Sequence, residues 1–252
     1  MTTIITSENK KIYFASDQHL GAPTPEASLP REKKFVAWLD AIKEDAGTVF
    51  LLGDLFDFWF EYKTVVPKGF VRVLGKLAEL KDAGIDIYFF VGNHDLWMRD
   101  YFQKELNIPV FHEPQEFDIN GKLFLIGHGD GLGPGDYGYK RMKKVFTFPF
   151  FKWLFRWLHP DIGVKLGHYF SVKNKLISGD EDAQFLGEEN EWLALYCRKK
   201  LTEKHYDFFI FGHRHLPLEI KLNSSSTYIN LGDWIQYFTY GEFMKTFKLK
   251  EF

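Results

Sequence analysis

The sequence of 252 residues has little cysteine, no long apolar run and almost no net charge, and each shortage excludes a class of protein. Cys197 is the only cysteine, so the chain forms no intrachain disulfide and has no cysteine-based zinc site. No uncharged apolar run approaches the ~18 residues that a membrane span needs. Met1–Ser16 lacks a cationic head followed by an apolar stretch of signal-peptide length. We therefore expect a cytoplasmic chain with no targeting segment.

The low net charge conceals an uneven distribution. The formal charge of −2 gives the whole molecule no bulk attraction to nucleic acid or anionic lipid. Between Lys140 and Lys175, however, nine basic residues accompany a single acid, so this segment carries +8 and the remainder −10. The same segment holds nine aromatic residues, too many for one helix face, and some of these rings should remain exposed. A cationic, aromatic insertion in an acidic body is therefore predicted.

Short apolar runs alternate with helical patterns along the chain, which is typical of an α/β fold. The strand-like runs are 12–15, 49–52, 85–91, 123–126, 208–211 and 228–231. Apolar residues at helical spacing predict helices over 31–45, 69–82 and 188–204.

A polar cluster follows each of the first five strand-like runs. The clusters are Asp17-Gln18-His19, Gly53-Asp54, Gly92-Asn93-His94-Asp95, Gly127-His128-Gly129-Asp130 and Gly212-His213-Arg214-His215. Loops beyond the carboxyl ends of strands converge on the ligand crevice of open α/β sheets, so these clusters can meet in one site. Oxygen and imidazole ligands without thiolate suit Mn²⁺, Fe or Zn²⁺, and a carboxylate can bridge two such ions.

Each cluster alone has an ordinary structural explanation, such as a tight turn or a surface histidine. Their joint occurrence is more telling, because five of the nine histidines fall within them. The other four, His112, His159, His168 and His205, lie outside the clusters and are expected to be ordinary surface or packing residues.

The ordered set Asp-x-His, Gly-Asp, Gly-Asn-His-Asp, Gly-His and Gly-His-x-His resembles the calcineurin-like metallophosphoesterase superfamily. This resemblance implies a four-layer αββα sandwich with a centre of two metal ions. It assigns Asp17, His19 and His215 to the first metal, Asn93, His128 and His213 to the second, and Asp54 to the bridge between them. His94 would act as general acid or stabilise charge beside the phosphoryl group.

Within the superfamily, the chain resembles the UDP-2,3-diacylglucosamine hydrolases of lipid A biosynthesis. The stretches that carry this likeness are Asp17-Gln18-His19-Leu20-Gly21, the run from Gly53 to Trp59, His128-Gly129-Asp130 with Asp136-Tyr137-Gly138-Tyr139, and Leu231-Gly232-Asp233-Trp234. The resemblance implies a metallophosphoesterase core over 1–136 and 181–252, with a helical lid over 137–180. It also implies two Mn²⁺, with Fe or Zn as alternatives, and hydrolysis at the phosphorus next to uridine to give UMP and 2,3-diacylglucosamine 1-phosphate.

The same resemblance suggests contacts and partners. It places Asn93, Asp136, Ser171 and Lys175 at the nucleotide or sugar, and we expect Phe151, Trp153 and Phe155 of the lid to contact the acyl chains. The expected partners are the UDP-linked acylated sugar and an anionic membrane surface, with peripheral association at the inner membrane. No nucleic acid and no obligate protein partner are expected.

One departure from the family keeps other functions open. Many members have Arg in place of His94, so the chain could act on another nucleotide or lipid phosphoester. A soluble nucleotide phosphatase or cyclic-nucleotide phosphodiesterase would not need the cationic, aromatic insertion. A non-catalytic scaffold is disfavoured because every expected ligand is present, and a nuclease because the rest of the chain is acidic.

Overall fold

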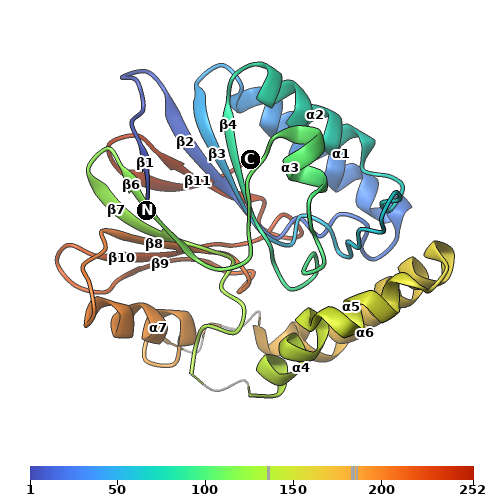
Figure 1. The fold of residues 1–252 in the computed structure, drawn as a ribbon. Coiled ribbons are helices and arrows are strands. Elements are labelled where there is room, and N and C mark those ends of the chain that lie inside the picture. Colours follow the sequence, from blue (N-terminus) through green and yellow to red (C-terminus); the bar gives the residue numbers. More distant parts are fainter. Residues whose placement is uncertain (135–136, 183–184, 186) are drawn as a thin grey trace.

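The computed structural model describes residues 1–134, 137–182, 185 and 187–252, with side chains for all of these except 172–182. Two six-stranded sheets pack face to face (Figure 1). The first has the order β12-β11-β2-β3-β4-β5 and the second β1-β6-β7-β8-β10-β9.

The first sheet is parallel in its centre. Its parallel strands are β2 (Lys11–Ala15), β3 (Ala46–Leu52), β4 (Asp86–Phe90) and β5 (Val110–Phe111), and the antiparallel β11 (Thr239–Phe243) and β12 (Phe247–Glu251) extend it. Three helices cover its outer face: α1 (Pro25–Ile42), α2 (Val71–Asp82) and α3 (Tyr101–Leu106) (Figure 1).

The second sheet is mixed. Its strands are β1 (Thr2–Ile4), β6 (Gln115–Ile119), β7 (Lys122–Ile126), β8 (Phe208–Phe211), β9 (Pro217–Lys221) and β10 (Thr227–Leu231). Strands β7, β8 and β10 run parallel, and α7 (Trp192–Leu201) covers the outer face.

Three clusters of buried apolar side chains separate these four layers. One lies between the first sheet and its helices and contains Trp38, Trp59 and Trp234. A second lies between the two sheets, where the rings of Phe14 and Phe50 stack 5.1 Å apart, and a third lies beneath α7. The structure thus confirms the four-layer sandwich, whose layers are held together by burial of aliphatic and aromatic side chains.

The predicted elements are found, but some of their ends differ. Helix α1 begins at Pro25 instead of residue 31, because Thr24 caps it by accepting a hydrogen bond from the Ala27 amide at 3.2 Å and proline is favourable in the first turn. The predicted helix 188–204 is shorter, since α7 spans Trp192–Leu201. Short or edge strands such as β1, β5 and β12 have no strong apolar pattern and were not predicted.

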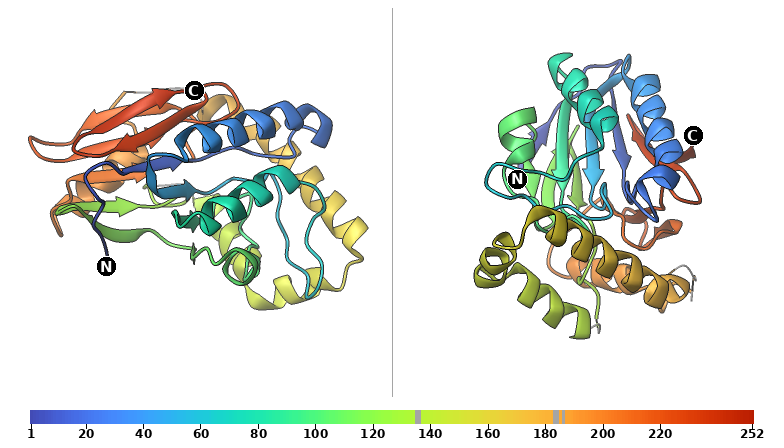
Figure 2. Two further views of the ribbon diagram at one scale, coloured as in Figure 1. Left: turned by 90° about the horizontal axis from the view of Figure 1, so that it is seen from above. Right: turned by 90° about the vertical axis from the view of Figure 1, so that its right-hand side faces the viewer.

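Three helices form a separate group beyond the carboxyl ends of the parallel strands (Figures 1 and 2). They are α4 (Tyr137–Thr147), α5 (Pro149–Arg156) and α6 (Pro160–Asp182), which we call the helical insertion. The expectation of exposed rings is confirmed: Phe148 is 56%, Trp153 51% and Trp157 74% exposed. Within the described part of the chain, no helix is long and apolar enough to cross a membrane.

Candidate metal centre

The carboxyl ends of five parallel strands bring the predicted ligands together. Asp17 and His19 follow β2, and Asp54 follows β3. Asn93 and His94 follow β4, and the remaining histidines, His128, His213 and His215, follow β7 and β8. Both sheets therefore contribute to one site at the end of the sandwich that faces the helical insertion (Figure 1).

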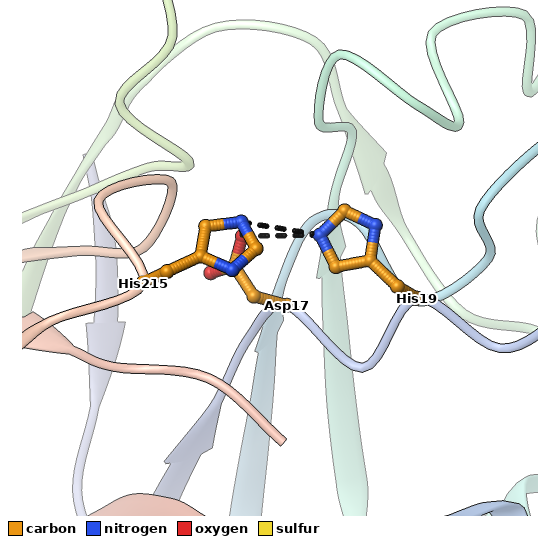
Figure 3. A group of neighbouring side chains, drawn as sticks. All are labelled: Asp17, His19 and His215. Atoms are coloured by element: carbon orange, nitrogen blue, oxygen red, sulfur yellow. Dashed lines mark hydrogen bonds and ion pairs between the residues drawn. The ribbon is translucent and has the colours of Figure 1, made fainter. Parts of the chain in front are cut away.

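The first group of side chains consists of Asp17, His19 and His215 (Figure 3). The Nε2 atoms of His19 and His215 lie 3.2 Å apart. Oδ1 of Asp17 lies 3.4 Å from Nε2 of His215 and 3.9 Å from Nε2 of His19. Three donor atoms from two turns thus face a common point, as metal binding requires.

The second group consists of Asp54, His128 and His213, joined by Asn93. Nε2 of His128 lies 3.2 Å from Oδ1 of Asn93. Oδ2 of Asp54 lies 3.4 Å from Nε2 of His128 and 3.7 Å from Nε2 of His19, so this carboxylate reaches both groups. Its position is that of a ligand shared by two ions.

Two features indicate that these residues fit divalent cations. Oδ1 of Asp17 is fully buried and accepts no hydrogen bond from any described residue, an arrangement that is costly unless a cation faces the oxygen. The Nδ1 atom of His128 lies 2.7 Å from the Leu52 carbonyl, which can only accept, so in the neutral ring Nδ1 carries the proton and Nε2 has the lone pair that would face a cation. For His215, Oδ2 of Asp233 lies 3.3 Å from Nδ1 and has the same effect.

The backbone of the ligand turns is strained. Five of the eight site residues adopt positive φ angles: Asp17 at 59°, His19 at 44°, Asp54 at 53°, His213 at 70° and His215 at 53°. Such conformations cost on the order of 1–3 kcal/mol each in non-glycine residues and persist only where the surrounding structure enforces them. A side chain at Gly92 would overlap the Asp54 carboxylate, which explains the glycine before Asn93.

The charges in the metal-free site compensate one another. Burial alone would raise the pKa of Asp54, but His128 and His94 hold it well below its usual value. Burial likewise opposes protonation of His128, yet the carboxylate of Asp54 raises its pKa to about 10. Burial and the neighbouring His128 lower the pKa of His213 to about 3. The metal-free cluster therefore retains a proton on His128, which a divalent cation would displace on binding.

His94 contacts both groups, and with His19 and Asp54 it forms a third set of side chains close enough to hold a metal ion. Its ring lies edge-on to His19, with centroids 4.6 Å apart, and its amide donates a 2.8 Å hydrogen bond to Oδ1 of Asp54. Nδ1 of His94 lies 3.0 Å from the main-chain oxygen of Asp57.

Several residues that position the site were not predicted. Asp57 is fully buried, with Oδ1 3.5 Å from Nδ1 of His19. Asp95 accepts hydrogen bonds from the amides of Gly92 at 2.7 Å and Leu55 at 3.0 Å, which ties two ligand turns together, and burial raises its pKa to about 7. Both aspartates lie in motifs noted in the sequence, but sequence alone gave no reason to separate them from turn residues.

His168, which was expected to be a surface or packing residue, packs against the site. Its Nδ1 lies 3.4 Å from Oδ2 of Asp57. A hydrogen bond to Asp57 raises the pKa of His168, although burial opposes it. The sequence around His168 gave no signal of this contact, because Asp57 lies far away along the chain.

A cavity of about 1290 Å³ extends from the metal centre to the helical insertion. Its walls include His19, Asp54 and His213 at one end and Phe146, Phe155 and Phe170 at the other. Phe155 also packs against Trp97 and Phe60, with ring centroids 4.6 and 4.7 Å away. The cavity thus combines a polar, metal-binding end with an apolar end.

The predicted substrate contacts are distributed unevenly around this cavity. Asn93 and Ser171 line it, whereas Phe151 and Trp153 lie on the exposed surface and are not among the lining residues. Asp136 lies outside the described residues, as does the side chain of Lys175.

Two of the basic residues of α4 face the core. Lys143 pairs with Asp130 at 2.7 Å, and Lys140 donates a hydrogen bond to the carbonyl of Gly133. Arg141 and Lys144 are exposed. The cation-rich face predicted for the insertion is therefore smaller than its composition suggests.

Comparison with known proteins agrees with this geometry. Residues 10–217 match the family model described as calcineurin-like phosphoesterase. A UDP-2,3-diacylglucosamine hydrolase from Porphyromonas gingivalis is 39% identical, and the match covers 91% of this chain and 92% of that protein. A protein of the same name from Actinobacillus succinogenes is 27% identical over 89% of this chain and 92% of its own length.

Proposed function

This chain belongs to the calcineurin-like phosphoesterase family, and from that premise we propose that it hydrolyses the pyrophosphate of UDP-2,3-diacylglucosamine. The products would be UMP and 2,3-diacylglucosamine 1-phosphate. The observation that carries the proposal is the continuity of the metal-binding cluster with a large cavity whose far end is aromatic. Pockets for drug-sized ligands are typically ~300–1,000 Å³, so a cavity of about 1290 Å³ suits a nucleotide with long apolar chains.

The residues of the site would have different roles in this reaction. Asp17, His19 and His215 would hold one ion, Asn93, His128 and His213 a second, and Asp54 both. Two divalent cations, which we propose to be Mn²⁺, would supply an activated water and would compensate the negative charge of the phosphates. Asn93 contributes a neutral oxygen, which limits the negative charge that would repel the substrate.

In the proposed step, water adds to the phosphorus next to uridine, and the bond from that phosphorus to the bridging oxygen breaks. The bridging oxygen leaves with the sugar phosphate. His94, whose ring adjoins His19 and whose amide is fixed by Asp54, would donate a proton or a hydrogen bond to the phosphate oxygens as charge develops.

We propose that the helical insertion acts as the lid over the acyl chains and as the contact with the membrane. Phe150, Trp153 and Trp157 of its outer surface are 54%, 51% and 74% exposed, and Arg141 and Lys144 are exposed on α4. Aromatic rings beside cations favour the interface of an anionic bilayer, where each cation contributes about 1 kcal/mol. The chain would therefore associate peripherally with the cytoplasmic face of the inner membrane.

A second candidate is hydrolysis of a smaller nucleotide phosphoester at the same centre. His94 favours it, because this residue follows the general pattern of the superfamily rather than the arginine of many UDP-2,3-diacylglucosamine hydrolases. The apolar end of the cavity argues against it, since a small polar substrate would leave those rings unused.

Product analysis distinguishes the two candidates. Purified protein with Mn²⁺ is incubated with UDP-2,3-diacylglucosamine in ¹⁸O-labelled water, and separately with small nucleotide phosphoesters. We expect UMP that contains ¹⁸O, together with unlabelled diacylglucosamine 1-phosphate. Label in the sugar phosphate would contradict attack next to uridine, and turnover of the small esters alone would support the second candidate. An Asp54→Ala protein serves as the inactive control.

A further inference from the structure

Helix α6 of the helical insertion makes unusually close contact with the core segment that follows Asp54. A side chain at Gly163 would overlap the hydroxyl of Tyr62, and one at Gly167 would overlap the ring of Phe58. Glycine destabilises a helix interior. Its occurrence at two positions one turn apart therefore indicates that α6 must approach the core segment closely there. The next residues on the same face of α6 are His168 and Ser171.

Those two side chains reach Asp57. The Ser171 hydroxyl lies 2.8 Å from Oδ2 of Asp57 and 2.9 Å from its main-chain oxygen, and Nδ1 of His168 lies 3.4 Å from Oδ2. The other carboxylate oxygen of Asp57 lies 3.5 Å from Nδ1 of His19. One buried carboxylate therefore contacts the insertion on one side and a candidate metal ligand on the other.

Ser171 also contacts His94 directly. Its Oγ lies 2.8 Å from Nδ1 of His94, and the same nitrogen lies 3.0 Å from the main-chain oxygen of Asp57. Because a carbonyl oxygen only accepts, Nδ1 of His94 carries the proton, and the Ser171 oxygen can accept from it while its own hydrogen goes to Asp57. The two acceptors fix the imidazole ring, and neither of them uses Nε2.

We infer that docking of α6 orients His94, so that the position of the helical insertion and the chemical step are coupled through Ser171. Ser171 is thus a positioning residue that the insertion contributes, in addition to any contact that it makes with the sugar. His168 connects the insertion to the site a second time, through its contact with Asp57. The inference rests on the proposed function, because it assigns His94 a role in phosphoester hydrolysis.

The experiment uses a small substrate that has no sugar, so that a loss of sugar contacts cannot affect its turnover. Hydrolysis of bis(p-nitrophenyl) phosphate with Mn²⁺ is measured for the wild type, Ser171→Ala, Ser171→Thr, His94→Ala and the double variant. We expect Ser171→Ala to lower kcat about 10–100-fold, the range typical of residues that hold a functional group in place, with unchanged manganese content. Ser171→Thr should restore most of the rate, and Ser171→Ala should cause no further loss once His94 is absent.

The control is Ile162→Ala, an exposed position on the same helix, which should leave the rate unchanged. If Ser171→Ala spares this substrate and lowers only turnover of UDP-2,3-diacylglucosamine, Ser171 is a substrate contact and the inference is overturned. The inference would also be overturned if the loss of kcat in the double variant equalled the product of the losses in Ser171→Ala and His94→Ala.

A second readout is independent of activity. In the metal-free protein, the Nδ1 proton of His94 should give a protected ring N–H resonance in NMR spectra, broadened by exchange with water in Ser171→Ala. An unchanged resonance contradicts the inference. If the wild type hydrolyses neither substrate, the proposed function fails, while this resonance still reports whether α6 orients His94.

Discussion

The metal-ligand turns and the outer surface of the helical insertion represent two opposite ways of building a functional surface. Asp17, His19 and Asp54 are at most 1% exposed, adopt strained backbone conformations and are held by hydrogen bonds from neighbouring turns. Phe148 and Trp157 of the insertion are 56% and 74% exposed. In the proposed function, the core supplies the chemistry with fixed geometry, and the exposed apolar surface of the insertion would select the substrate.

Removal of metal should separate the two regions most strongly, because hydrolysis at the core would depend on the ions whereas vesicle binding by the insertion would not. EDTA should abolish hydrolysis of both the acylated and the small substrate, and added Mn²⁺ should restore it. Vesicle binding should persist in the stripped protein. Full activity after exhaustive removal of metal, checked by elemental analysis, would refute the mechanism.

Asp54→Ala should come next, since Asp54 is the carboxylate that reaches both groups of ligands. We expect loss of activity with little loss of stability in thermal unfolding, because the strands that carry the turns remain packed. Retention of both metals together with more than about a tenth of the wild-type rate would be inconsistent with a bridging role.

His94→Ala separates metal binding from catalysis within the core. The expected loss of rate is about 10²–10⁴-fold, the usual contribution of a general acid or base, while the metal content stays nearly unchanged. Loss of one metal ion in this variant would show that His94 is itself a ligand.

Arg214→Met tests how the core keeps its ligand turns in place. Arg214 lies between His213 and His215, and its Nε lies 3.2 Å from both carboxylate oxygens of Glu191, with both side chains buried. Loss of one partner of such a pair destabilises a protein by about 3–5 kcal/mol, measured by denaturant unfolding. A matched Arg214→Met/Glu191→Leu protein should recover most of that stability, and failure to recover would mean that the pair is not the main constraint.

Substitutions on the insertion should have the smallest effect on the chemistry. Replacement of Phe151, Trp153 and Phe155 by serine should greatly reduce turnover of the diacylated substrate and vesicle binding, but should spare the small phosphodiester. Phe155 packs against the core and lines the cavity, so the Phe151→Ser/Trp153→Ser pair isolates the exposed surface. Equal losses on both substrates would mean that the insertion only supports the fold.

The convergence of the candidate ligands was predictable because each of them follows a recognisable strand. Asp17 and His19, for example, follow the apolar run that ends at Ala15, and the parallel arrangement of the strands brings such turns together. The helices of the sandwich were predictable for a similar reason, since Phe35 and Trp38 repeat at helical spacing and are fully buried.

Other features could not be predicted because they depend on tertiary contacts. The network of Asp57, His168 and Ser171 joins residues up to 114 positions apart in the chain. The positive φ angles of the ligand turns arise from packing and hydrogen bonds between turns, which no local pattern records. Similarly, composition alone did not reveal that Lys143 pairs with Asp130 instead of facing outward.

The central claim is that the core performs the hydrolysis and the insertion selects an acylated substrate. A comparison of two substrates of the wild-type protein tests it most directly. The measurement is kcat/KM with Mn²⁺ for UDP-2,3-diacylglucosamine and for the same UDP-sugar without acyl chains. We predict UMP release from both, with a strong preference for the acylated compound. Equal kcat/KM values for the two would contradict the claim.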